Sequence, residues 1–240
     1  MLEKVSAFIS IEKIDRVSII HFDRSDGKNA LSFQALRELI SAVESFKDDF
    51  ETSAIIFTGT EQVFSLGFDL KDNETKQLNV ISLAERRQIL QLGPRLCKAI
   101  EKLEPFTIAA IDGWCIGGGM AITLACDLRI AGADSISFAP EIERGMNMSW
   151  QTVPRAIALM GPAKTKRIFI LSEQLNATKG LDWGYLDKIA LTGKALEAAM
   201  QVAKRIAEMP PVHVRMIKQG INAAAFALSD AVSSLDRDQY

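Results

Sequence analysis

Three consecutive glycines, Gly117, Gly118 and Gly119, are the part of this chain best suited to hold a negative charge. They follow residues 107–111, a short apolar run typical of a buried strand, and precede an apolar segment that predicts a helix to about residue 126. Glycine lets a ligand approach the backbone closely, and the first amides of a helix have no partner within that helix. This order of strand, glycines and helix predicts a binding site for an anion or an oxyanion.

A second glycine-bearing turn, Ser65-Leu66-Gly67-Phe68-Asp69, also follows a predicted strand. Two such turns could aim backbone amides into one pocket, and two converging amides are the construction of an oxyanion hole. The alternative is that the glycines of either turn only allow the chain to reverse tightly. The pairing of the two turns is the reason to consider chemistry at this place.

Glu141 is the acidic residue best placed to act beside these amides. It comes directly after Pro140 and the strand-like residues 135–138. A carboxylate there could serve as a general base, although spacing alone favours a solvated loop carboxylate. No G-x-G-x-x-G run follows a strand and no Walker phosphate loop occurs, so a dinucleotide or nucleotide site is a poor alternative.

The composition narrows the class of protein. Of 240 residues, 48% are hydrophobic and 24% are charged, which is ordinary for a soluble globular protein. The net charge of −2 argues against nucleic acid as a partner, and no apolar run reaches the length of a membrane span. Three scattered cysteines and no signal-peptide core favour a cytoplasmic protein, and the lack of a Cys/His cluster predicts no metal site.

Strands alternate with helices along the first two thirds of the chain, and helices dominate the final third. The patterns predict strands at residues 6–12, 16–22, 54–58, 107–111 and 128–131, and helices after Ser32 and at 83–103, 162–172, 196–209 and from 212 to the end. The polar residues 71–79 predict a mobile loop. We therefore expect an α/β core of repeated ββα units in residues 1–191 and a helical region in residues 192–240.

Four motifs in order resemble those of the crotonase (enoyl-coenzyme A hydratase/isomerase) superfamily. They are GKNALS from Gly27, FSLGFDL from Phe64, IAAIDGWCIGGGMAITLACDLRIA from Ile108 and SFAPEIERG from Ser137. The resemblance covers about residues 5 to 225. It implies a spiral of ββα units with a helical C-terminal trimerisation region, a homotrimer or dimer of trimers, and acyl-coenzyme A thioesters as substrates. Coenzyme A would be part of the substrate, so no separate cofactor is expected.

The resemblance also implies roles for individual residues. The backbone amides of Phe68 and Gly118 would hold the thioester carbonyl and stabilise the enolate that forms from it, and Glu141 would be the acid/base. The residues implied to hold the adenine and pantetheine parts of coenzyme A are Lys28, Asn29, Ala30, Leu31, Ser65, Gly67 and Asp69.

Two departures from the family pattern bear on the reaction. Family hydratases carry a first catalytic glutamate at the position of Ala121, and they usually carry glycines in the segment that here includes Trp150. One glutamate suffices for an isomerase, so the sequence favours double-bond isomerisation modestly over hydration. A hydrolase or decarboxylase of β-keto or malonyl-type thioesters, or an acyl-coenzyme A binding protein without turnover, are the alternatives.

Overall fold

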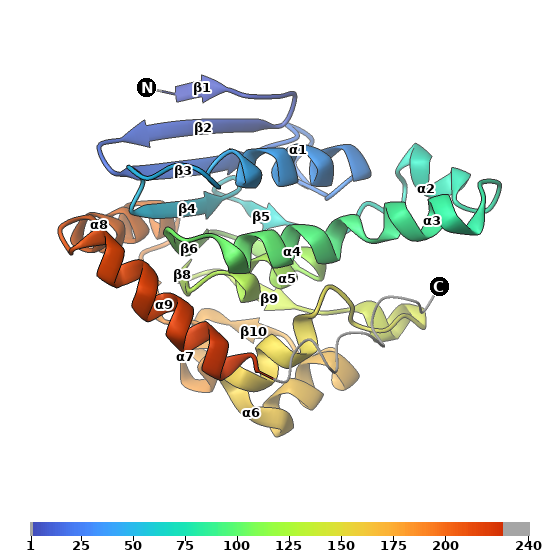
Figure 1. Cartoon of the computed structure of the whole chain (residues 1–240). Coiled ribbons are helices and arrows are strands. Elements are labelled where there is room, and N and C mark those ends of the chain that lie inside the picture. Colours follow the sequence, from blue (N-terminus) through green and yellow to red (C-terminus); the bar gives the residue numbers. More distant parts are fainter. Residues whose placement is uncertain (1, 228–240) are drawn as a thin grey trace.

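Two β-sheets form the frame of the protein in the computed structural model, which describes residues 2–227 (Figure 1). Within these residues the larger sheet has the strand order β1 (Leu2–Lys4), β2 (Ile9–Ile14), β3 (Val17–Phe22), β4 (Ala54–Thr58), β6 (Phe106–Ile111), β8 (Leu128–Gly132) and β11 (Lys188–Ala190). The smaller sheet has the order β10 (Leu175–Asn176), β9 (Ile136–Phe138), β7 (Trp114–Ile116) and β5 (Val63–Ser65).

Helices pack around both sheets (Figure 1). They are α1 (Phe33–Glu44), α2 (Asn73–Gln77), α3 (Leu83–Leu90), α4 (Leu92–Lys102), α5 (Gly118–Ala125), the 3₁₀ helix η1 (Glu141–Arg144), α6 (Thr152–Leu171), α7 (Ala177–Trp183), α8 (Ala195–Ala207) and α9 (Pro211–Ala225). In Figure 1, α2 and α3 project to the right of the sheets.

Successive strand pairs divide between the two sheets. β4, β6 and β8 lie parallel and adjacent in the larger sheet, while the strands that follow them, β5, β7 and β9, lie parallel and adjacent in the smaller sheet. One or more helices follow each pair before the chain returns to the larger sheet. This arrangement confirms the predicted α/β spiral of ββα units.

The central strands are buried on both faces. Along β4, Ile55 and Phe57 join one core with α1 and α4, whereas Ala54 and Ile56 join a second core beneath α8. The side-chain period of two in a strand produces this division. Apolar core therefore lies on both faces of the larger sheet. The central strands could be predicted from the sequence because their apolar residues are continuous.

The predicted helix over residues 83–103 is in fact two helices, α3 and α4, which meet at Gln91. Pro94 lies in the first turn of α4, where its missing N–H does no harm, and it cannot continue an uninterrupted helix from α3. The expected loop over residues 71–79 contains the short helix α2, whose cap is Asp72, with its side chain accepting from the Glu74 amide.

The helix predicted at residues 162–172 begins ten residues earlier, at Thr152, and it is kinked at Gly161. The backbone of Gly161 has a φ of 77°, outside the helical region, and Pro162 starts the second segment. The kink places the first segment of α6 directly after the loop that carries Trp150. The strand expected at residues 6–12 is β2, which begins later, at Ile9, and ends later, at Ile14.

The C-terminal region has two parts with different surroundings. α8 packs on the larger sheet through four buried alanines, Ala195, Ala198, Ala199 and Ala203. α9 presents exposed apolar side chains at Val212, Met216, Ile217 and Ile221. The helix predicted from residue 212 to the end is described only as far as α9, and residues 228–240 lie outside the described part. The three-fold assembly stays a prediction.

Candidate active site

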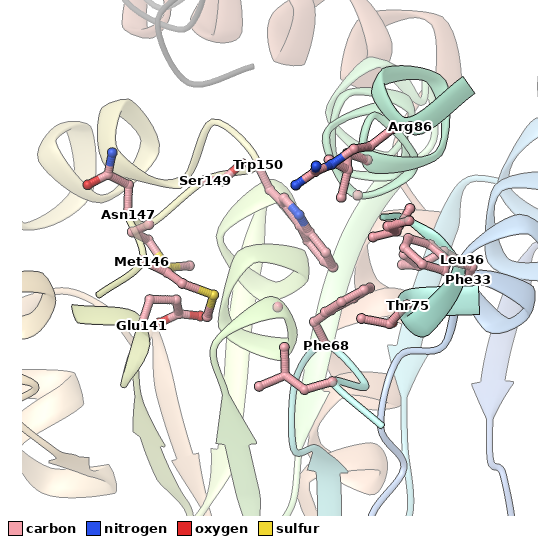
Figure 2. A pocket seen from close by; sticks show the side chains of 16 residues that line it. Phe33, Leu36, Phe68, Thr75, Arg86, Glu141, Met146, Asn147, Ser149 and Trp150 are labelled. Carbon is pink, nitrogen blue, oxygen red and sulfur yellow. The ribbon is translucent and has the colours of Figure 1, made fainter. Parts of the chain in front are cut away.

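A cavity of about 250 Å³ lies between the helices α1, α3 and α4 on one side and the segment from η1 to Trp150 on the other (Figure 2). Its walls are mostly apolar. The lining residues are Phe33, Leu36, Phe68, Leu70, Thr75, Leu78, Arg86, Leu90, Gly93, Gly118, Glu141, Met146, Asn147, Met148, Ser149 and Trp150. Both predicted amide donors and the predicted general base therefore line one cavity.

The two glycine-bearing turns meet at the cavity. A Cβ atom on Gly67 would lie 3.3 Å from the Gly118 nitrogen and 2.8 Å from the Ile116 oxygen, so only glycine permits this approach. Within residues 2–227 neither the Phe68 nor the Gly118 amide donates to another backbone group. Gly118 is the first residue of α5, where amides lack helical partners. The backbone at this junction can receive an oxyanion.

Glu141 lies against the same junction. A Cβ atom on Gly117 would lie 2.4 Å from Glu141 Oε1, so the absence of a side chain makes room for the carboxylate. Glu141 Oε2 is buried and has no hydrogen-bond partner. Burial raises the pKa of Glu141, and the Glu141 amide and the Arg144 charge offset this only in part. A carboxylate of this kind holds a proton more readily than a solvated one and can exchange it with a ligand in the cavity.

Trp150 covers the other side of the junction. Its indole packs on Gly93 of α4, where a Cβ atom would lie 1.9 Å from Cε2, and it reaches over Gly118, where a Cβ atom would lie 2.8 Å from Cη2. Figure 2 shows the ring extending into the cavity toward Phe68. The indole therefore narrows the space in front of the Gly118 amide.

The backbone that carries this indole is left-handed at two successive residues, with φ of 62° at Trp150 and 57° at Gln151. Arg155 holds both: its Nη1 donates to the Trp150 carbonyl oxygen at 2.8 Å and to the Gln151 carbonyl oxygen at 3.2 Å. The Arg155 guanidinium also pairs with Glu101 of α4 at 2.8 Å, with both side chains nearly or fully buried. Residues other than glycine rarely adopt this backbone conformation unless the surrounding structure imposes it.

The two segments predicted to hold coenzyme A are joined by backbone hydrogen bonds. The Leu31 amide donates to the Gly67 oxygen at 2.8 Å, the Leu66 amide to the Lys28 oxygen at 3.1 Å, and the Asp69 amide to the Leu31 oxygen at 3.0 Å. The ledge formed by residues 28–31 and 65–69 is continuous with the cavity, because Leu31 Cδ1 and Phe68 both reach the Gly118 junction.

Several side chains of this ledge are engaged within the protein. Asn29 is buried and donates to the Phe22 and Phe64 oxygens, and the Ser65 hydroxyl donates to the Asn29 oxygen. Asp69 pairs with Arg24 at 2.7 Å. The Lys28 side chain is exposed. Asn29, Ser65 and Asp69 therefore shape the ledge, while the Lys28 side chain is exposed and the Phe68 side chain lines the cavity.

Ala121 lies on α5 and is buried. Among residues 2–227, Glu141 is the only acid that lines the cavity. Sequence reasoning missed the contributions of α1, α3 and α4, in particular Phe33, Arg86 and Gly93. The apolar face of α1 was visible in the sequence, but its use as a cavity wall depends on contacts with distant segments.

The cavity brings two amides that lack backbone partners within residues 2–227 and one buried carboxylate into one apolar site. Groups of these kinds are able to polarise a carbonyl group and to exchange a proton with the neighbouring carbon. No helix of residues 2–227 combines the length and apolarity needed to cross a membrane. The same residues contain no cluster of His, Cys, Asp or Glu able to hold a metal ion.

Comparison with known proteins identifies the family. The profile described as Enoyl-CoA hydratase/isomerase matches residues 12–239, and the chain belongs to this family, within the crotonase superfamily. A short-chain-enoyl-CoA hydratase of Clostridium acetobutylicum is 30% identical over 215 residues, which is 89% of this chain and 80% of the relative. An enoyl-CoA isomerase/hydratase of Mycosarcoma maydis, fer4, is 29% identical over 85% of this chain and 76% of its own.

Solved structures agree on the fold. An enoyl-CoA hydratase from Mycobacterium avium subsp. paratuberculosis superposes with a TM-score of 0.87 over 98% of this chain and 93% of that chain. The sequences are 22% identical, so this likeness speaks for the fold. The matches together support an enzyme with the crotonase fold.

Proposed function

We propose that the protein acts on an enoyl-coenzyme A thioester through an enolate, with Glu141 as its single acid/base. The amides of Phe68 and Gly118 hold the thioester oxygen as it gains negative charge. Glu141 removes a proton from C2 and returns it at C4, so the double bond moves and no water is consumed. Stabilisation of the enolate oxygen contributes most to the rate, since loss of one such donor costs about 10²- to 10³-fold in rate.

The observation that carries this proposal is the contact between the Glu141 carboxylate and Gly117, the residue before Gly118. The carboxylate occupies the space where a Gly117 Cβ would be, one residue from the Gly118 amide. A base at that place reaches the carbon next to the carbonyl whose oxygen the amides receive. Its raised pKa brings it closer to the values that suit proton exchange with carbon.

Isomerisation is favoured over hydration by two features of the cavity. Hydration in the family uses two carboxylates with a water molecule between them, and the residue at the first carboxylate position is the buried Ala121. The Trp150 indole covers the Gly118 face of the cavity, where it excludes water. One carboxylate in an apolar, narrowed cavity suits proton transfer within the substrate.

Coenzyme A lies along the ledge of residues 28–31 and 65–69 in this proposal. Carbonyl oxygens of that ledge can accept a second hydrogen bond, from the adenine and pantetheine parts, and the exposed Lys28 side chain offers a charge to a phosphate group. The ledge leads to the Phe68 amide, so the thioester reaches the oxyanion site from this direction.

A panel of thioesters tests the reaction directly. Purified protein is assayed with 3-enoyl, 2-enoyl, β-keto and malonyl thioesters of coenzyme A, alongside the Glu141→Gln variant. We expect the highest turnover with 3-enoyl thioesters, appearing as conjugated 2-enoyl products, and a loss of at least about 10³-fold in Glu141→Gln with coenzyme A binding retained. Turnover confined to β-keto or malonyl thioesters would transfer the proposal to a hydrolase or decarboxylase.

A further inference from the structure

One cation in the cavity has no role in the chemistry proposed above. Arg86 of α3 lines the cavity, and among residues 2–227 it is the only Lys or Arg that does so. The side chain is partly buried, and its Nε is buried and has no hydrogen-bond partner within the same residues. Proteins rarely leave a buried N–H of a charged group unpaired, because the lost hydration is costly. The arrangement calls for an anionic partner, and the described part of the chain does not supply one.

The local structure holds Arg86 in place and keeps neighbouring acids away from it. The capping box of α3 joins Ser82 and Glu85, so the Glu85 carboxylate is engaged one residue before Arg86. The Arg86 amide donates to the Ser82 oxygen at 2.9 Å, which fixes the first turn. The side chain thus projects from a well-capped helix, and Figure 2 shows its guanidinium extending from α3 toward the Trp150 indole.

Arg86 lies at the opposite end of the cavity from the general base. Figure 2 places Glu141 and Arg86 on opposite sides, with the Trp150 ring between them. Arg144, rather than Arg86, is the cation that lowers the pKa of Glu141 against the effect of burial. Arg86 therefore does not serve as the partner of the base, and its charge is directed at the part of the ligand farthest from the reacting carbon.

The walls of the cavity that Arg86 lines are mostly apolar, with Leu36, Leu78, Leu90 and Met148 among them. Such walls suit the methylene groups of an acyl chain, and a guanidinium at the end of them suits a carboxylate, which it can bind through two parallel hydrogen bonds. The phosphates of coenzyme A are better matched by the exposed charge of Lys28 on the ledge.

We infer that the acyl group of the substrate carries a second carboxylate at its far end, which pairs with Arg86. The substrates would be thioesters of unsaturated dicarboxylic acids, with one carboxyl group esterified to coenzyme A and the other free. This inference deepens the proposed function, on which it rests for the place of the thioester, and it names the substrate class of the same site.

Binding of unreactive thioesters tests the inference without any turnover. Calorimetry compares glutaryl- and adipyl-coenzyme A with pentanoyl- and hexanoyl-coenzyme A, which have the same chain lengths and no free carboxylate, and with coenzyme A alone. The proteins are the parent, Arg86→Gln, Arg86→Lys and Arg87→Gln. Arg87 is the control, because it is an exposed neighbour on α3 that does not line the cavity.

In the parent we expect at least one dicarboxylic thioester to bind at least about 10-fold more tightly than its neutral counterpart. Arg86→Gln should remove that preference, Arg86→Lys should retain part of it because the charge remains without the planar fork, and Arg87→Gln should retain all of it. Pentanoyl-coenzyme A and free coenzyme A should bind Arg86→Gln and the parent within about 2-fold of each other.

Two outcomes would overturn the inference. A parent protein that binds the neutral thioester as well as the dicarboxylic one at both chain lengths has no carboxylate site at Arg86. An Arg86→Gln variant that loses affinity equally for all thioesters and for free coenzyme A shows that Arg86 contacts a phosphate group. A preference for the dicarboxylic thioesters in a protein that turns over none of the enoyl thioesters, with unsaturated dicarboxylic thioesters added to the panel, would support this inference and refute the proposed reaction.

Discussion

Two left-handed backbone turns border the same cavity and are built in opposite ways. The first is at Gly117, with a φ of 50°, and the second covers Trp150 and Gln151, with φ of 62° and 57°. Glycine adopts this conformation at little steric cost, and its missing side chain leaves space that the Glu141 carboxylate fills. The second turn has large side chains in a conformation that costs of order 1 kcal/mol or more for each residue.

The two turns differ in what they place at the cavity. The glycine turn leaves room for the Glu141 carboxylate, and in the proposed function it also presents the Gly118 amide to the substrate. The Trp150 turn places an indole in the cavity, and the left-handed backbone aims the ring over Gly118. Since the second turn is not favoured locally, it depends on a distant clamp, the pair of Arg155 and Glu101. One turn is specified by its own residues and the other by the fold around it.

Removal of the Arg155–Glu101 clamp should have the largest effect, and that effect should be on the free energy of unfolding. Arg155→Met breaks a buried ion pair and both bonds to the Trp150 turn. We expect a loss of about 3 kcal/mol in the free energy of unfolding, at the low end for such pairs because Lys98 still pairs with Glu101. Denaturant titration measures it.

The control for Arg155→Met is Arg37→Met, which breaks a pair with Glu74 that is much more exposed. It should cost no more than about 1 kcal/mol. Equal losses in the two variants would mean that Arg155 contributes no more than a surface residue, and the second turn would then need another explanation.

A side chain on the glycine turn should have the next largest effect, this time on activity. In Gly117→Ala the new Cβ would lie 2.4 Å from Glu141 Oε1, so the carboxylate must move. Displacement of a catalytic group by about 1 Å can cost about 10²-fold in rate, which is the loss that we expect in kcat.

Gly161→Ala is the matched control for Gly117→Ala. Gly161 likewise has a backbone conformation that glycine alone adopts readily, with φ of 77° and ψ of 167°, but a Cβ atom there would have no neighbour within 4 Å. Both variants bear backbone strain of this kind, and only Gly117→Ala disturbs Glu141. A similar fall in kcat for the two variants would contradict the role given to the contact between Gly117 and Glu141.

Conversion of the second turn to glycine should have a smaller effect. Trp150→Gly relieves the strain at one residue and removes the indole from Gly93 and Gly118. We expect the cavity to lengthen, so that kcat/KM for longer acyl chains improves by about 10-fold relative to the shortest one, a shift of about 1.4 kcal/mol. Trp150→Phe keeps a ring there and should change this ratio less. An unchanged chain-length profile in Trp150→Gly would show that the indole does not limit the cavity.

The smallest expected effect is on the pH dependence of protein stability, and it comes from the burial of Glu141. Burial raises the pKa of Glu141 above its usual value of 4.5, so the folded protein binds this proton more tightly than the unfolded chain does. The stability that this proton confers is fully present below pH 4.5 and is lost as the pH rises through the folded-state pKa.

The neutral variant Glu141→Gln should therefore gain Tm relative to the parent as the pH rises. Thermal unfolding measured well below and well above pH 4.5 tests this. A difference in Tm that stays constant, or that shrinks as the pH rises, would mean that the Glu141 carboxylate is not disfavoured in the folded protein.

The glycine turn could be predicted from the sequence because its signals are local. A buried strand, three glycines and an apolar helix follow one another within residues 107–126, and Glu141 comes at the end of the next strand. Trp150 could be suggested as a pocket residue from the sequence, but the clamp and the packing of the indole on Gly93 could not, since they join residues far apart in the chain. Arg86 was equally hidden, because an arginine on a polar helix is usually solvated. The break at Gln91 was missed because Pro94 is tolerated in the first turn of α4.

The central claim is that a single carboxylate, Glu141, moves a proton at C2 of a thioester held by the Phe68 and Gly118 amides. The most direct measurement is the exchange of the C2 protons of a bound acyl-coenzyme A for deuterium, followed by NMR in deuterium oxide with the parent and Glu141→Gln. The account predicts exchange in the parent and a rate at least about 10³-fold lower in the variant, with thioester binding unchanged. Exchange at the parent rate in Glu141→Gln would contradict it.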